Sequence, residues 1–139
     1  MAIVYVELGR VDEARAFARE ALAAAPPTDP LTDIAWVAAE LELGEELSAR
    51  LEQAPLPSRW IDAARALLAG DNVGAAEVFA DIGSSLSEAH TRLRAAEQLV
   101  SEGRRAEADE QLERALAFFR SVGATRYIRK GEALLAMTA

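Results

Sequence analysis

Apolar residues recur every three or four positions along most of the chain, which is the period of an amphipathic α-helix. The clearest example is 104–123, where one face carries Ala108, Leu112, Ala115, Leu116 and Phe119. Glycine or proline interrupts the pattern repeatedly, as happens where helices end. The pattern therefore predicts an all-α protein. The expected helices are 11–24, 31–43, 45–54, 58–69, 73–82, 85–102, 104–122 and 126–137, with 1–8 as the tail of a further helix rather than a strand.

Several residues predict how these helices begin and end. Gly9, Gly44, Gly70 and Gly103 each follow an apolar run and are expected to end the first helix of a pair. Ser85 and Glu88 have the spacing of a capping box, in which each side chain satisfies a free backbone N–H. Thr125 is expected to cap the last helix.

The helix pairs repeat. The intervals between Gly9, Gly44, Gly70 and Gly103 are 35, 26 and 33 residues, so two of the three match a period of about 34. The segments 9–14 and 103–108, GRVDEA and GRRAEA, share Gly, Arg, Glu and Ala in register. An Ala-Leu pair follows at the same offset in both, at 21–22 and at 115–116.

These residues resemble the tetratricopeptide repeat, a helical hairpin of about 34 residues. The resemblance covers nearly the whole chain and is weakest over 31–54, where the second helix is short. The matching positions are Ala2, Tyr5, Gly9, Ala14, Ala21 and Pro26 in one unit; Trp60, Ala63, Ala64, Leu67 and Phe79 in another; and Ala96, Leu99, Gly103, Ala108, Ala115 and Leu116 in a third.

The resemblance implies a right-handed α-α superhelix of about four hairpins plus a terminal helix. We expect a single domain, 1–139, with units at about 1–27, 28–56, 57–83 and 84–122 and a terminal helix at 125–137. In this family the first helices of the hairpins line a concave surface. The implied function is a scaffold that binds a peptide or partner protein there.

The segment 112–136, LERALAFFRSVGATRYIRKGEALLA, resembles the helical tail of bacterial ATP-binding regulators and adenylyl-cyclase-linked signalling proteins. This implies an alternative function, a regulatory or sensing tail that binds a small molecule or signal peptide. The chain lacks GxxxxGK[ST], the phosphate-binding motif of such regulators. We therefore expect a fragment, or an abbreviated relative, of a longer repeat protein.

The composition limits which kinds of bonding, binding and cellular location are expected. The 31 alanines in 139 residues favour closely packed helices. The absence of cysteine excludes disulfides and favours a reducing cytoplasm. No apolar run is long enough for a membrane span, and a net charge of −8 opposes general binding to nucleic acid. We expect a cytoplasmic protein without cofactor or metal.

Catalysis is not expected. His90 lies near Asp81 and Ser84, Ser85 and Ser87, but a turn and helix cap explain these residues better than a nucleophile triad. Among the acidic residues of 107–113, Glu110 lies four residues before Arg114, a spacing that favours an ion pair on a solvated helix face, and a cation site is the alternative. The basic residues of 114–139 are likewise expected on a solvated capping helix, with contact to nucleic acid or an acidic partner as the alternative.

The candidate binding residues lie on predicted first helices. They are Trp36, Trp60, His90, Leu93, Arg94 and Glu97. Trp60 and Leu93 would provide apolar anchors, and Arg94 and Glu97, together with Arg92, would provide selectivity. Core packing is the alternative for the tryptophans, and a solvent-facing position is the alternative for His90. A homodimer through a terminal repeat is also expected, because an uncapped repeat end must be covered.

Overall fold

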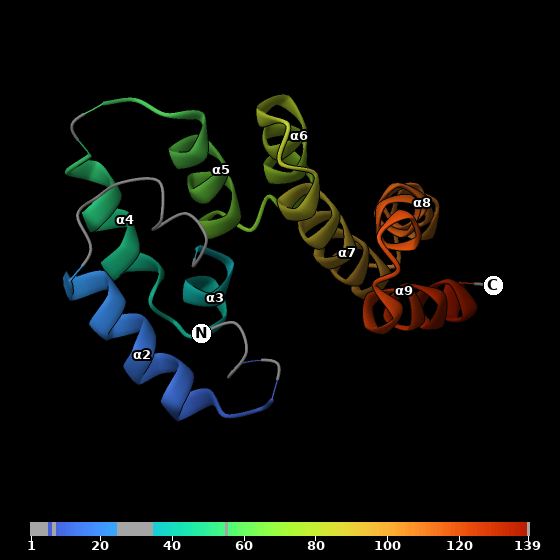
Figure 1. The fold of residues 1–139 in the computed structure, drawn as a ribbon, viewed down its shortest axis with the longest axis horizontal. Helices are drawn as coiled ribbons and strands as arrows, with labels where there is room; N and C mark the ends of the chain where they lie inside the picture. Colours follow the sequence, from blue (N-terminus) through green and yellow to red (C-terminus); the bar gives the residue numbers. More distant parts are fainter. Residues whose placement is uncertain (1–5, 7, 25–34, 55, 139) are drawn as a thin grey trace. The chain divides into compact units, whose positions relative to one another are not determined.

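The structure, a computed structural model, describes residues 6, 8–24, 35–54 and 56–138 (Figure 1). These residues form helices joined by turns, and no strand occurs among them, so the all-α prediction is confirmed for this part of the chain. The predicted tail 1–8 lies almost wholly outside the described residues, as do Ala2, Tyr5 and Pro26. The chain divides into two compact units, 1–70 and 71–139. The predicted hairpin 57–83 is divided between them.

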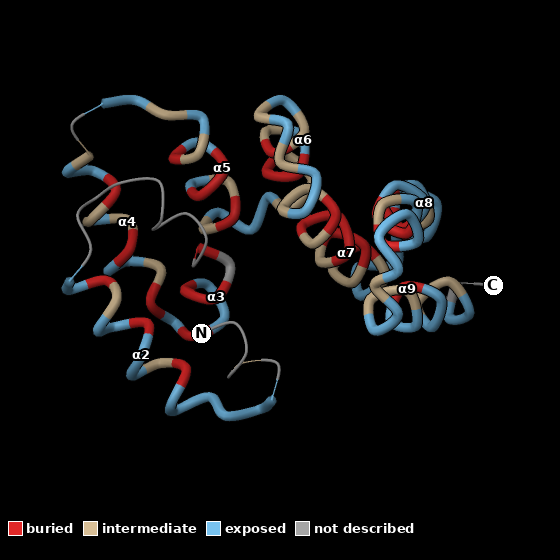
Figure 2. Tube along the Cα trace, in the orientation of Figure 1, coloured by how far each residue is buried: buried red, intermediate tan, exposed pale blue. Residues whose placement is uncertain are grey.

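The described residues of the first unit include four labelled helices. They are α2 (Val11–Ala24), α3 (Ala35–Glu40), α4 (Gly44–Glu52) and α5 (Arg59–Leu68). Helix α3 packs against α5 and α4, and α4 also contacts α2. Many of the buried positions are alanine, which lets helix axes approach closely (Figure 2). The buried apolar residues are Ala14, Ala18, Leu22, Ala35, Val37, Ala38, Leu41, Leu43, Leu47, Leu51, Ile61, Ala63, Ala64 and Leu67.

The turn between α3 and α4 differs from the prediction. Helix α3 ends at Glu40, and Gly44 is the first residue of α4 rather than the end of the preceding helix. The left-handed residue of this turn is Glu42, with φ of 60°. Leu41 and Leu43, on either side of it, are almost completely buried. Their burial offsets the roughly 1–2 kcal/mol that a side chain costs in this conformation.

Ser58 begins α5 as its N-cap. The backbone of Ser58 is extended, and its side-chain oxygen accepts a hydrogen bond from the Trp60 N–H at 3.2 Å. Pro57 precedes the cap, where its missing N–H is not required by the helix. The predicted start of this helix is therefore confirmed.

The second unit is also helical. It contains α6 (Asn72–Ile82), α7 (Ser85–Ser101), α8 (Arg105–Ser121) and α9 (Thr125–Thr138). Helices α7 and α8 form a hairpin, α6 packs on α7, and α9 packs mainly on α8. The predicted apolar face of 104–123 is confirmed, because all five of its residues are buried. A continuous core cluster joins Ala89, Leu93, Ala96, Leu99, Ala108, Leu112, Ala115 and Phe119.

The capping box predicted at Ser85 and Glu88 is wrong. The N-cap is Ser84, whose hydroxyl lies 2.9 Å from that of Ser87 and makes no cap hydrogen bond. The Glu88 carboxylate instead accepts a hydrogen bond from the buried Arg92. Thr125 likewise does not cap α9 but is its first residue. The carbonyl of Ala124 accepts the first N–H bonds there.

Gly131 lets α9 approach α8 closely. A Cβ at this position would lie 2.7 Å from Cδ2 of Leu116, whose side chain is buried. We expect Gly131→Ala to lower the free energy of unfolding by about 1–3 kcal/mol, the usual effect of overpacking. Urea denaturation measures the change. Ala133 is exposed on the same helix, so Ala133→Gly measures how much helix propensity alone changes the free energy of unfolding. Stabilisation of Gly131→Ala by about 1 kcal/mol, as propensity alone predicts, would contradict close packing.

Candidate functional site

The six predicted binding residues are divided between the two units. Trp36 lies in α3, where only its backbone is described, and Trp60 lies half-buried in the first turn of α5. The other four, His90, Leu93, Arg94 and Glu97, lie on α7. The structure therefore brings together the α7 residues alone.

Two residues expected at the surface of α7 are buried. Leu93 is 3% exposed and belongs to the core cluster between α7 and α8. Arg92 is 1% exposed and is enclosed by α6 and α8. Neither side chain can contact a partner in this structure. The anchor predicted at Leu93 and the selectivity predicted for Arg92 are corrected accordingly.

His90 packs against aromatic rings from two other helices. Its ring centroid lies 5.4 Å from that of Phe119 in α8 and 4.4 Å from that of Tyr127 in α9. Both contacts are edge-on, with interplanar angles of 82° and 68°. Phe119 and Tyr127 stack on each other at 4.9 Å. His90 is thus half-buried at the junction of three helices rather than solvent-facing.

Further along α7, a charged pair also connects this helix with α9. Glu97 accepts from the Lys130 ammonium at 2.7 Å, and both side chains remain more than a third exposed. Arg94 lies four residues after His90 and three before Glu97, so the helical period puts all three on one side of α7. We name this surface the α7–α9 face and define it by His90, Arg94, Glu97, Tyr127 and Lys130.

Much of the basic charge of 114–139 is paired with carboxylates. Arg120 lies 3.0 Å from Glu132, and Arg114 lies 2.9 Å from Glu77. With the Lys130 pair, at least three of the five basic side chains in this segment have an acidic neighbour. The positive charge that this segment presents to a polyanion is correspondingly lower than its composition indicates.

The acidic segment that begins at Glu107 takes part in ion pairing at the α7–α8 turn. Glu107 accepts two hydrogen bonds from Arg104, at 2.7 and 2.8 Å, and Glu102 accepts another at 3.0 Å. The Arg104 hydrogen bonds hold the pKa of Glu107 below its usual value. Among the described residues, no three acidic or histidine side chains are grouped as a metal site.

Among the described residues of the first unit, an apolar hollow lies between the end of α4 and α5. It is lined by Leu51, Leu56 and Ile61, with Glu52 and Arg65 among its polar residues. Leu56 is 74% exposed, which makes it the most exposed large apolar side chain described. Its described lining contains no histidine, serine or threonine.

The described helices include none that is both long and apolar enough to cross a lipid bilayer. The chain was also compared with protein-family models, with curated proteins and with solved structures. None of these comparisons found a match.

Proposed function

We propose that the chain is a protein-interaction scaffold of tetratricopeptide-like hairpins. In this proposal the hairpins follow a right-handed superhelix, and first helices such as α7 contact a peptide or a partner protein. The observation that carries the proposal is the α7–α9 face. Three of the six residues selected from the sequence, His90, Arg94 and Glu97, share one side of α7, and His90 and Glu97 contact α9 there.

The α7–α9 face has the composition of a binding surface. Protein interfaces are enriched in aromatic residues and arginine at their centre, with charged residues at the rim. Here the half-buried His90 and Tyr127 form an aromatic centre, and the Glu97–Lys130 pair lies at one edge. The ring contacts fix the positions of His90 and Tyr127, so little side-chain entropy is lost when a partner binds.

Arg94 is the residue whose substitution tests this function most directly. It is half-buried, and arginine is among the residue types that contribute most to binding energy. We expect Arg94→Glu to weaken partner binding roughly 10-fold or more, since it reverses the charge of a half-buried residue of the face. Recovery of partners from an extract of the native host, followed by titration of the recovered protein, measures this change.

Arg129→Glu is the matched control. It makes the same charge change on α9, at an exposed position two residues from Tyr127 and therefore on the other side of the helix. The control variant is expected to bind as wild type does. Equal binding by wild type and Arg94→Glu would remove the α7–α9 face from the proposal.

A further inference from the structure

A buried arginine outside the α7–α9 face connects three helices. Arg92 of α7 is 1% exposed, and each of its guanidinium nitrogens donates a hydrogen bond. Nε donates to Glu88 at 2.8 Å, and Nη1 donates to Gln111 of α8 at 2.7 Å. Nη2 donates to Glu77 of α6 at 2.9 Å.

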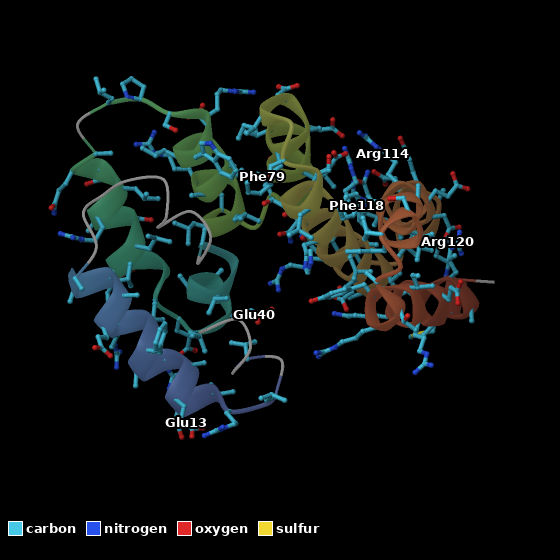
Figure 3. All side chains as sticks on the ribbon, in the orientation of Figure 1. Glu13, Glu40, Phe79, Arg114, Phe118 and Arg120 are labelled. Carbon is cyan, nitrogen blue, oxygen red and sulfur yellow. The ribbon has the colours of Figure 1, made fainter. Side chains whose placement is uncertain are left out.

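Arg114, which projects from α8 (Figure 3), binds the same two carboxylates. Its Nη1 donates to Oε1 of Glu77 at 2.9 Å, and its Nη2 donates to Oε1 of Glu88 at 3.1 Å. One oxygen of Glu77 therefore accepts from both arginines. The hydrogen bond from Arg92, followed by the charge of that arginine, holds the pKa of Glu77 below its usual value.

The members of this group differ greatly in exposure. Arg92 has a side chain only 1% exposed, whereas the side chains of Glu77 and Arg114 are 54% and 44% exposed. A buried guanidinium must keep its anionic partners, because an unpaired charge there costs several kcal/mol. Glu88 balances only one of the two arginine charges, so a second anion is favoured where Glu77 Oε1 lies, and the side chain that supplies it enters from the surface.

We propose that Arg92 and Arg114 form a carboxylate-binding site, and that Glu77 fills this site from within the chain. Without the Glu77 carboxylate, the site takes a carboxylate from solution. The guanidinium N–H groups match the geometry of carboxylate oxygens. Charge also favours a single negative charge, since the two arginines and Glu88 together carry one net positive charge once Glu77 is removed.

The test is chemical rescue of Glu77→Ala by acetate. The substitution leaves a helix-favouring residue at a half-exposed position and removes only the carboxylate arm. The midpoint of thermal unfolding is measured in sodium acetate and in sodium chloride at equal ionic strength. We expect acetate to raise the midpoint of Glu77→Ala by roughly 4 °C or more above chloride and in a saturable manner, as binding to the folded state requires.

Three variants make the test specific. Glu77→Gln keeps a side chain in the site and is expected to respond to acetate no more than wild type does. Glu107→Ala removes the surface carboxylate that pairs with Arg104 in the same unit. Its unfolding midpoint is expected to be the same in acetate and in chloride. Adding Arg114→Ala to Glu77→Ala is expected to abolish the rescue.

Two results would overturn the proposal. One is an equal response of Glu77→Ala to acetate and chloride, and the other is a rescue that persists without the Arg114 guanidinium. If Glu77→Ala is unfolded in chloride, recovery of helical ellipticity on adding acetate is the expected result. Failure to recover then counts against the site in the same way.

Discussion

Replacing Phe119 with alanine is expected to lower the free energy of unfolding of the second unit by about 3–5 kcal/mol. The ring is completely buried, and it contacts His90 of α7 and Tyr127 of α9. Its removal leaves a cavity where α7, α8 and α9 meet, and the stacked and edge-on ring contacts are lost in addition. Urea denaturation followed by ellipticity measures the loss.

Phe118→Ala is the matched control for this substitution. Phe118 precedes Phe119 on α8 and is only partly buried at the edge of the core cluster. We expect it to lose clearly less stability, because its side chain keeps contact with water in the folded protein. Equal losses for the two variants would contradict the position of Phe119 at the centre of the unit. Phe119→Leu, with a smaller cavity, serves if the alanine variant does not fold.

Replacing Arg92 with alanine is the second substitution with a large expected effect. It is expected to lower the free energy of unfolding by about 3–5 kcal/mol. The loss has two sources. The hydrogen bonds from three guanidinium nitrogens disappear, and Glu88 and Gln111 keep polar groups that are poorly reached by water. Thermal and urea unfolding of the purified variant measure the change.

Arg104→Ala is the control that separates burial from ion pairing. Arg104 also donates to two carboxylates, those of Glu102 and Glu107, but its side chain is 51% exposed. We expect a far smaller loss there, since exposed ion pairs contribute little to stability. If Arg92→Ala and Arg104→Ala were equally stable, burial of the Arg92 guanidinium would not explain its contribution.

Much of the local structure could be predicted, because local rules determine it. Gly70 and Gly103 end helices with φ of 76°, a conformation that glycine adopts without steric cost. The same rule failed at Gly44, since the left-handed residue of that turn is Glu42. The two leucines beside Glu42 are buried there, and the apolar pattern alone does not indicate which residue of the turn takes the left-handed conformation.

Side-chain pairing between helices could not be predicted in the same way. Glu88 has the right spacing from Ser85 for a capping box, but its carboxylate binds Arg92 and also Arg114, which is 26 residues away. Nothing in the sequence around Glu88 or around Arg114 indicates that these two residues pair. One local signal was present for Arg92 itself. It lies three residues after Ala89 and four before Ala96, on the side of α7 that carries the apolar residues.

The candidate site likewise has a part that could be predicted from local sequence and a part that depends on packing between helices. The helical period was sufficient to group His90, Arg94 and Glu97 on one side of α7. The same period aligns Leu93 with Ala89 and Ala96, which are buried, and the anchor role predicted for Leu93 did not take this alignment into account. The contribution of Tyr127 and Lys130 depends on how α9 packs, which the close approach at Gly131 helps to determine.

The division of the chain also places its tryptophans in one unit. Both tryptophans lie in residues 1–70, whereas residues 71–139 carry Tyr127 and no tryptophan. Tryptophan emission therefore comes from residues of the first unit, while helical ellipticity comes from both units. In a denaturant titration, two units that unfold independently give different midpoints by these two signals, and two units that unfold together give one. The native sequence thus contains its own spectroscopic label for the cooperativity between its halves.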